Sequence, residues 1–253
     1  MLPIAETKYG FVDRSLGAHL ARTIMVDELN HLFGMCDAAL ETAGYRKAIV
    51  DENMLLKKTV GTRVESYRRL HQLYGLNPSF LIFRAMRELW TYAESSRQLL
   101  ALLCALGRDP ILRCTSDLMI ETSENGSLTA KSFEYVIEKN YPGRLNTKTL
   151  ASAGRNVASS WTQSGHLQGL TEKTRKHVHA EPVVVAYALL IAYLTGARGD
   201  ALFESGWLKI LDTPTHTART FAQQSAQKGW LEYRYSGQVT DITFRHFLAE
   251  DIS

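Results

Sequence analysis

Cysteine is scarce in this chain of 253 residues. The three cysteines, Cys36, Cys104 and Cys114, are odd in number and form no CxxC motif. This pattern argues against a disulfide framework and predicts reduced thiols, as in the cytoplasm. Long apolar runs are also missing: the longest, Val183 to Leu194, is too short to span a bilayer and predicts a buried helix. The first ten residues lack the pattern of a secretory signal, so we expect a cytoplasmic protein without membrane contact.

The motifs of common enzyme classes are missing as well. There is no GxxxxGK[ST] phosphate loop, no HExxH and no GxSxG. Asp51 and Glu52 are adjacent, so on a helix they point about 100° apart and cannot share a metal ion. His177 and His179 are the only histidine pair with ligand-like spacing, and no carboxylate or cysteine motif accompanies them. We therefore expect no catalytic residue, metal or cofactor, although sites assembled from distant residues stay open.

Charge is ordinary in amount and almost balanced in sign. Hydrophobic residues make up 45% of the chain and charged residues 22%, which indicates a folded globular protein. The net charge is +3 and the isoelectric point about 8.7, only mildly basic. Any contact with nucleic acid must therefore come from local basic patches.

Helical periodicity dominates, with apolar residues three or four apart over segments such as Thr62 to Tyr74 and Pro78 to Leu106. Hairpin signals occur only later in the chain. The fold class predicted is mainly α: a helical body with helix-turn-helix or winged-helix subdomains that carry small β-hairpin wings. The predicted divisions are an N-terminal helical domain with a helix-turn-helix-like segment (1–110), a middle winged-helix-like domain (111–180) and a C-terminal winged-helix domain (181–253).

The last fifty residues have the order of a winged helix. Thr213 is expected to cap a helix that has Pro214 in its first turn and ends at Gly229. A hairpin follows, with its turn at Ser236-Gly237. The outward residues suited to phosphates and base edges are Arg219 and Gln223 on the helix and Arg234 on the hairpin. Such a face also occurs on protein-docking modules and on solvated surface, although nucleic acid is the favoured interpretation.

A second unit of this kind is predicted in the middle of the chain. A scaffold helix from Ser127 to Asn140 precedes a helix capped by Asn146 or Thr147 and ended by Gly165. The outward face of this second helix carries Lys148, Ser152, Arg155 and Asn156. The basic segment after it lies where a wing is expected, and either a phosphate-contacting wing or a solvated loop fits its Lys173, Arg175 and Lys176.

A third segment near the N-terminus is similar to a helix-turn-helix. Thr59 or Thr62 is expected to cap a helix with Val64, Tyr67, Leu70 and Leu73 inward and Arg63, Ser66 and Arg69 outward, preceded by Lys57 and Lys58. A helix with arginines on its outer face is more often merely soluble than DNA-reading. This segment alone is therefore a weak indication.

The same segment carries a family resemblance. The run Asp51-Glu52-Asn53-Met54-Leu55-Leu56-Lys57-Lys58-Thr59, followed by Thr62-Arg63 and an Arg-Arg-Leu helix, resembles the BrxA family of BREX bacteriophage-exclusion loci. The segment from Leu145 to Leu167, with its Leu-Asn-Thr-Lys-Thr-Leu opening, is similar too. The resemblance implies a mostly helical, non-enzymatic DNA-binding accessory protein from that family or from another phage-defence locus.

Together these patterns predict a protein that binds double-stranded DNA. Because the outward faces are rich in Arg, Lys, Thr and Ser, we expect mostly backbone contacts and weak sequence preference. Replacing Arg155 or Arg219 with Ala should then reduce the salt dependence of binding by about one unit each. The alternative is a protein–protein adaptor that assembles defence components through its winged-helix surfaces.

Overall fold

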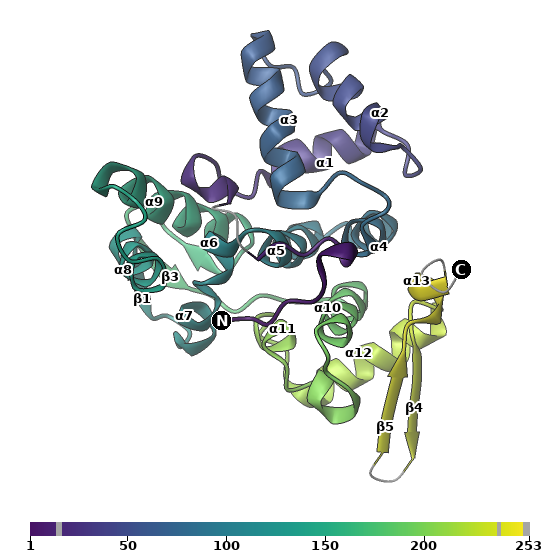
Figure 1. Ribbon diagram of the computed structural model, residues 1–253. Coiled ribbons are helices and arrows are strands. Elements are labelled where there is room, and N and C mark those ends of the chain that lie inside the picture. The colour runs from purple at the N-terminus through teal and green to yellow at the C-terminus, as the bar shows by residue number, and fades with distance from the viewer. Residues whose placement is uncertain (14–16, 237–238, 250–253) are drawn as a thin grey trace.

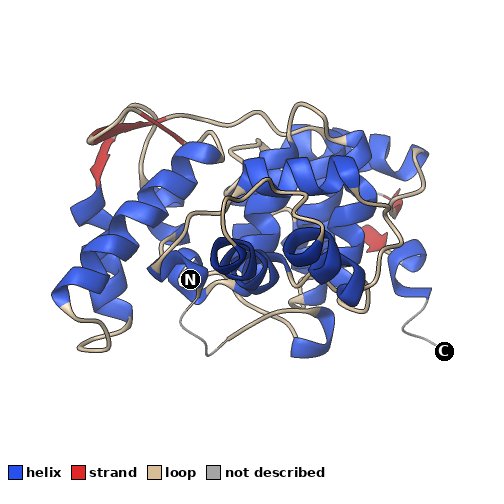
Figure 2. Ribbon diagram, turned by 90° about the horizontal axis from the view of Figure 1, so that it is seen from above, coloured by secondary structure: helices blue, strands red, loops and turns tan. Residues whose placement is uncertain are grey.

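The computed structural model of the chain describes residues 1–13, 17–236 and 239–249. These residues are mainly helical, with a three-stranded and a two-stranded antiparallel sheet at opposite ends of the molecule (Figures 1 and 2). The predicted fold class, a helical body that carries small β-hairpins, is confirmed. The two parts of the chain in which the sequence predicts wings therefore lie far apart.

The first part of the chain folds into packed helices. Thr59 caps the longest of them, because its Oγ1 accepts a hydrogen bond from the Thr62 N–H at 3.2 Å, and Gly75 ends it with φ 87°. The cap at Thr59 is thus confirmed. The helices of this part are α1 (Val26–Met35), α2 (Thr42–Arg46), the π-helical turn η3 (Lys47–Asp51), α3 (Val60–Tyr74), α4 (Leu81–Leu89) and α5 (Arg97–Arg108).

The segment with helical periodicity from Pro78 to Leu106 is not one helix, since α4 and α5 are separate helices. The turn η4 (Trp90–Tyr92) and four further residues divide them. In this break, the hydroxyl groups of Ser95 and Ser96 donate to the Glu181 carboxylate. Serine side chains that bond away from the helix compete with the helical conformation. The apolar spacing continues across the break because both helices face the same core.

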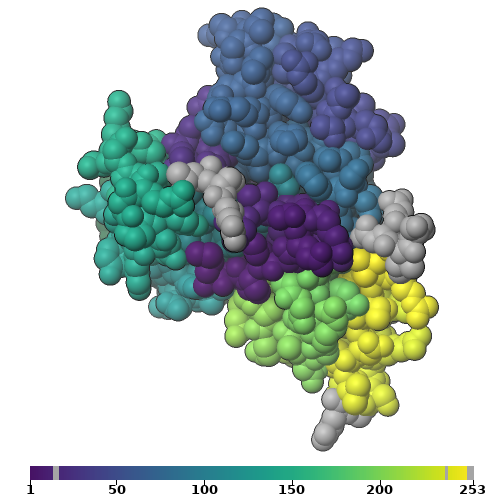
Figure 3. Space-filling model, viewed as in Figure 1, coloured from purple at the N-terminus to yellow at the C-terminus, as the bar shows by residue number. Residues whose placement is uncertain are grey.

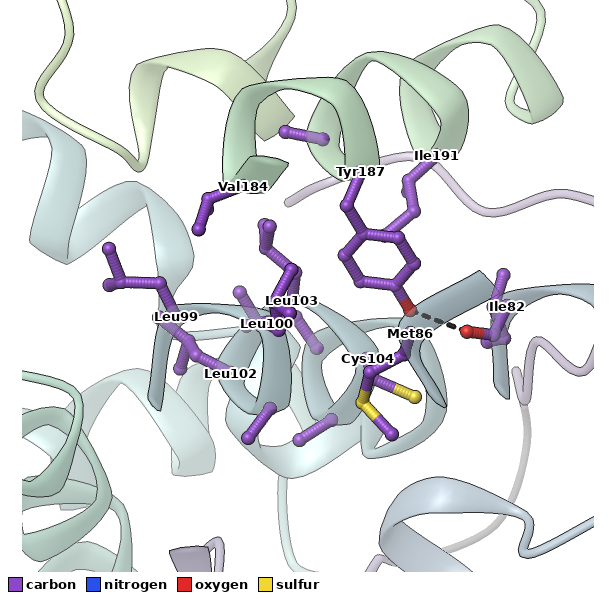
Figure 4. Close-up of a cluster of buried hydrophobic side chains, with 14 of the residues drawn as sticks. Ile82, Met86, Leu99, Leu100, Leu102, Leu103, Cys104, Val184, Tyr187 and Ile191 are labelled. Atoms are coloured by element: carbon purple, nitrogen blue, oxygen red, sulfur yellow. Dashed lines mark hydrogen bonds between the residues drawn. The ribbon is translucent and has the colours of Figure 1, made fainter. Parts of the chain in front are cut away.

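The centre of the core is α10 (Pro182–Leu194), which confirms the buried helix predicted there. Figure 4 shows its Val184 and Tyr187 above the leucines of α5. The Tyr187 hydroxyl donates to the Ile82 carbonyl of α4 at 2.7 Å. A buried tyrosine hydroxyl usually has such a partner. This helix therefore joins the last third of the chain to the first.

The middle of the chain forms a compact unit around two helices that pack closely. Its elements are α6 (Pro110–Arg113), α7 (Ser116–Glu121), β1 (Ser127–Thr129), α8 (Ala130–Asn140), α9 (Thr147–Gln163), β2 (Leu167–Gln168) and β3 (Glu172–Arg175). The strands pair antiparallel in the order β1-β3-β2. The predicted scaffold helix thus starts three residues late, because residues 127–129 pair with β3 as a strand.

The C-terminal part follows the predicted order of helix and hairpin. It contains the turn η5 (Gly199–Leu202), α11 (Gly206–Lys209), α12 (Thr215–Gln227), β4 (Glu232–Ser236), β5 (Val239–Thr243) and α13 (Arg245–Leu248). The predicted cap at Thr213 is wrong: its hydroxyl donates to the Leu211 carbonyl, and Pro214 stands at the cap position. Gly229 ends the helix with φ 78°, as predicted. Gly237 of the predicted turn lies outside the described residues.

Three buried arginines bind the main-chain carbonyls at the ends of helices. Arg87 donates to the last carbonyls of α1, Arg108 to those of α3 and Arg113 to those of α5. These carbonyls lie in or just after the last turn of a helix, at its negative end, where intrahelical donors run out. Burial lowers the pKa of Arg108 and Arg113, and the carbonyls offset part of that cost. The first part of the chain thus uses guanidinium groups as internal helix caps.

The apolar core continues through the three predicted divisions. The buried residues form one cluster from Leu2 to Phe247. The first boundary falls where α6 follows α5 after Asp109, and the second at Glu181, the residue that precedes α10. Neither position is a linker. The divisions themselves stay a prediction, and the space-filling view in Figure 3 shows them as adjoining lobes.

Candidate nucleic-acid interface

The outward face of α9 is the best-formed of the predicted contact surfaces. Asn146 begins the helix, its Oδ1 accepting a hydrogen bond from the Thr149 N–H at 2.9 Å. Val157 and Trp161 are buried, as predicted. The opposite face holds Lys148 and Arg155, which are exposed, and Ser152, which is half-buried; none of the three forms a side-chain hydrogen bond or ion pair with a described residue.

A close approach between α8 and α9 fixes this face. Gly154 lies where the helices cross, and a Cβ atom there would stand 2.7 Å from the Ala130 carbonyl oxygen and 2.5 Å from a side-chain carbon of Glu134. Glycine is the residue that allows such a crossing, because any side chain would collide with the neighbouring backbone. The angle of α9, and hence the direction of its exposed face, depends on this contact.

Strands β2 and β3 form a short hairpin beside α9, where the sequence allows a wing, and we call this hairpin the wing. Gly169 in its turn has φ 119°, and the tip residue Leu170 is 93% exposed. The sequence predicts that Lys173 faces solvent, but it is buried. Its ammonium donates to the Gly169 carbonyl at 3.0 Å and to Thr162 Oγ1 of α9 at 2.9 Å. Lys173 therefore braces the wing against α9.

Arg175 is also an internal residue, and its predicted DNA contact is wrong. Its side chain is 1% exposed and forms an ion pair with Asp212, while its Nε donates to the Met119 carbonyl. Alternation along β3 places it on the same inner face as Lys173. Lys176 is half-buried and donates to Asn125 Oδ1 at 2.9 Å. The basic patch is thus largely structural.

A groove of about 540 Å³ separates α9 from the wing turn. Three cations from three elements line it: Lys131 on α8, Arg155 on α9 and Lys173 on β3. Its apolar lining comes from Ala130, Ala158 and Leu170. No carboxylate is present among the described residues that line the groove. Lys131 is exposed and unpaired within the described chain, and the sequence patterns gave no signal for it because it lies in the first turn of the scaffold helix.

The N-terminal set of predicted contacts is mostly engaged within the protein. Lys57 pairs with Glu28 at 3.0 Å, and Arg69 with Glu65 at 2.6 Å. The Nη1 of Arg63 lies 3.5 Å from the Val50 carbonyl. Ser66 is buried and Val64 is 46% exposed, the reverse of the predicted orientation. Lys58 alone of the predicted set is exposed and has no partner in the described part of the chain.

In the C-terminal set, one predicted contact residue is paired within the protein and two are free. Arg219 forms an ion pair with Asp200 at 2.8 Å, donates to Thr240 Oγ1 and lies 4.6 Å from the ring centre of Phe203. It therefore ties α12 to β5. Gln223 and Arg234 are exposed, and neither has a side-chain partner among the described residues.

The three predicted sets do not form one surface. Helix α3, helix α9 and the β4–β5 hairpin lie on three different sides of the molecule (Figures 1 and 3). Of these, the neighbourhood of α9 brings free cations from two helices next to a hairpin turn. We name this the α9–wing surface and define it by Lys131, Lys148, Ser152, Arg155, Leu170 and Thr171.

On the buried side of α9, three residues form an arrangement that the sequence did not reveal. His19 Nδ1 lies 2.8 Å from Asp109 Oδ2, and His19 Nε2 lies 2.9 Å from Ser160 Oγ. Serine hydrolases use such a series, but here all three side chains are buried, and Ser160 Oγ also donates to the Asn156 carbonyl and accepts from the Ile24 N–H. The arrangement joins the segment before α1 to α9.

Asn156 belongs to the same buried contact. Its side-chain amide donates to the His19 carbonyl at 2.9 Å, so the only asparagine predicted on this face is not free to read adenine. The N–H at His19 Nδ1 can donate to Asp109. Burial acts to raise the pKa of Asp109, but contacts with His19 and with backbone N–H groups outweigh it and lower the pKa. These contacts fix the position of α9 rather than its outward chemistry.

The chain matches no protein-family model and no curated protein. Within residues 1–13, 17–236 and 239–249, no three His, Cys, Asp or Glu side chains are grouped closely enough to hold a metal ion. In the same ranges, every helix is too short or too polar to cross a bilayer.

Proposed function

We propose that this protein binds double-stranded DNA through the α9–wing surface, as a non-enzymatic accessory of a bacterial phage-defence system. The observation that carries the proposal is the pair of free cations Lys148 and Arg155 on one exposed face of α9, beside a hairpin with an exposed tip. Side chains of this kind neutralise phosphates and release condensed counterions. DNA therefore lies along α9, with the wing turn beside the same duplex.

The order of elements supports a winged-helix assignment for the middle unit. A strand precedes the helix pair α8–α9, and the following hairpin returns to pair with that strand. In helix-turn-helix proteins the second helix of the pair lies in the major groove. That helix is α9 here. The close crossing at Gly154 supports a fixed angle between the two helices.

The proposed contacts favour phosphate over base recognition. Lys131, Lys148 and Arg155 are suited to phosphate oxygens, and Ser152 to either phosphate or base edges. With Asn156 bound to His19, no amide side chain is free on this part of the helix to read adenine. We therefore keep the proposal of weak sequence preference.

The placement in phage defence rests on the resemblance to the BrxA family. The second similar segment, 145–167, spans the whole of α9 and so coincides with the proposed DNA-contacting helix. The first, 51–59, ends at the residue that caps α3. The three free cysteines support the proposed cytoplasmic location.

A duplex titration followed by fluorescence anisotropy tests the proposal. Binding is expected at micromolar protein in low salt, and Arg155→Ala should weaken it for every duplex and reduce the salt slope by about one unit. Lys209→Ala is the matched control, because Lys209 is exposed on α11 and has no described partner. No binding at tens of micromolar protein would refute the proposal. If Arg155→Ala abolishes preference for one sequence only, Arg155 reads a base.

A second candidate function is a protein adaptor, favoured by an exposed apolar stripe at the start of α3. Leu56, Val60 and Val64 are 78%, 61% and 46% exposed, and the two valines lie one helical turn apart. Exposed apolar patches of this kind mark protein contacts. Co-purification with nuclease treatment discriminates the two functions. Partners that survive digestion of DNA support the adaptor, whereas partners that are lost contradict it.

A further inference from the structure

The groove between α9 and the wing turn has more room and more apolar surface than a phosphate contact needs. Its volume of about 540 Å³ lies within the usual range of roughly 300–1,000 Å³ for small-molecule sites. The side chain of Leu170 in the wing turn is almost completely exposed, and half-buried Ala130 of α8 adds apolar lining. An apolar body of moderate size would cover this surface, and the cost of leaving Leu170 in water would be removed.

The polar lining of the groove has one sign of charge. Lys131 and Arg155 are exposed and have no described partner, and carboxylates are missing from its described lining. Lys173 also lines the groove, and burial lowers the pKa of its ammonium group. A desolvated ammonium and two free cations favour an anionic ligand and exclude a cationic one. The chemistry of the lining therefore selects a ligand with both an apolar body and a negative charge.

We propose that this groove binds a small amphipathic organic anion, with its apolar body against Leu170 and Ala130 and its acidic group between Lys131 and Arg155. Because Arg155 also belongs to the proposed DNA surface, such a ligand and DNA would exclude each other. That exclusion rests on the proposed function, whereas the ligand site itself does not. The ligand would act as an effector that releases the protein from DNA.

The probe for this site is 1-anilinonaphthalene-8-sulfonate, an aromatic body with one sulfonate, added to the intact protein without DNA. Fluorescence should rise to saturation at one probe per chain. Arg155→Ala and Lys131→Ala should each weaken binding about fivefold, as expected for one charge-assisted contact, and Leu170→Ser by a similar factor. These residues are exposed, so the variants should keep the wild-type circular dichroism spectrum and unfolding temperature.

Two controls separate the groove from nonspecific binding of the probe. Lys209→Ala removes another exposed cation, far from the groove in the sequence, and should leave the affinity unchanged. The neutral analogue N-phenyl-1-naphthylamine should bind at least tenfold more weakly, because it lacks the sulfonate. Unsaturable binding, or wild-type affinity in the three groove variants, would overturn the inference.

Addition of duplex DNA then tests the exclusion. Displacement of the probe by DNA, with a Kd equal to that from anisotropy, supports the effector role. If DNA binds without displacing the probe, the effector role is refuted. If DNA does not bind at all while the probe still requires Arg155 and Lys131, the proposed function fails and the anion site stands.

Discussion

Arg175 on β3 and Asp212 before α12 form an ion pair that is almost completely buried, with 2.6 Å between Nη2 and Oδ1. The second carboxylate oxygen of Asp212 accepts a hydrogen bond from the Val178 N–H at 3.0 Å. Asp212 itself has φ 51°, in the left-handed region. The pair therefore fixes the strand of the wing to the C-terminal part of the chain.

Asp212→Ala should destabilise the protein by about 3 kcal/mol, because it leaves the buried Arg175 guanidinium without its counter-charge. Asp212→Asn, which keeps an oxygen acceptor, should cost less. Urea unfolding at neutral pH measures both. A loss below about 1 kcal/mol for the alanine variant would contradict the importance of this pair.

Gly154→Ala should also destabilise the protein, by about 1–3 kcal/mol, since the new methyl group would overlap the Ala130 carbonyl oxygen. The matched control is Gly34→Ala in α1, where a Cβ atom meets nothing within 4 Å. That change should stabilise the protein by about 0.5–1 kcal/mol, the usual gain from alanine in a helix. In thermal and urea unfolding, the change in stability should therefore be negative for Gly154→Ala and positive for Gly34→Ala. A change of the same sign in both variants would refute the tight crossing.

Stability should fall between pH 6.5 and pH 4 because of His166. Burial lowers the pKa of this histidine to about 4, and its Nε2 donates to the Ile210 carbonyl at 2.8 Å. Since the unfolded chain takes up the proton near pH 6.5, the stabilisation is complete above that pH and is lost as the pH falls towards 4.

The loss from this one residue should be on the order of 3 kcal/mol. His166→Gln keeps a hydrogen-bond donor but does not titrate. Urea unfolding at pH 7 and pH 5 should therefore show a smaller decrease for the variant than for the wild type. An equal decrease in both proteins would assign the acid sensitivity to other groups.

Arg219→Ala should affect the hairpin more than DNA binding. Its guanidinium is already paired with Asp200 and bound to Thr240, so its removal should change the salt slope by much less than the one unit expected for Arg155→Ala. Hydrogen exchange of the β4–β5 amides should become faster in the variant. A full unit of slope with unchanged exchange would instead make Arg219 a phosphate contact.

Local patterns in the sequence predict much of the secondary structure. The caps at Thr59 and Asn146, the buried helix α10 and the end of α12 at Gly229 depend on residues near each other in the chain. Their physical causes are hydrogen bonds within one turn, or the burial of a continuous apolar segment. Such signals are present in the sequence itself.

The orientation of charged side chains could not be predicted in the same way. Arg175 faces inward because it bonds to Asp212 and to the Met119 carbonyl of α7, and neither residue is close to it in the sequence. Likewise His19 meets Ser160 across 141 positions. A basic residue is usually exposed, so the sequence alone favours the outer face. For part of the candidate site, contacts between residues far apart in the sequence turn the basic side chains inward instead.

The helix ends bound by Arg87, Arg108 and Arg113 bear on how relatives of this chain can be recognised. A guanidinium spreads several donors in one plane, whereas a lysine offers one compact ammonium that cannot reach two carbonyls of a helix end in the same way. Relatives that keep this fold should therefore retain arginine at these three positions and accept lysine freely only at exposed, unpaired ones such as Arg234. Three arginines at separations of 21 and 5 residues would then serve as a search pattern where overall similarity has been lost.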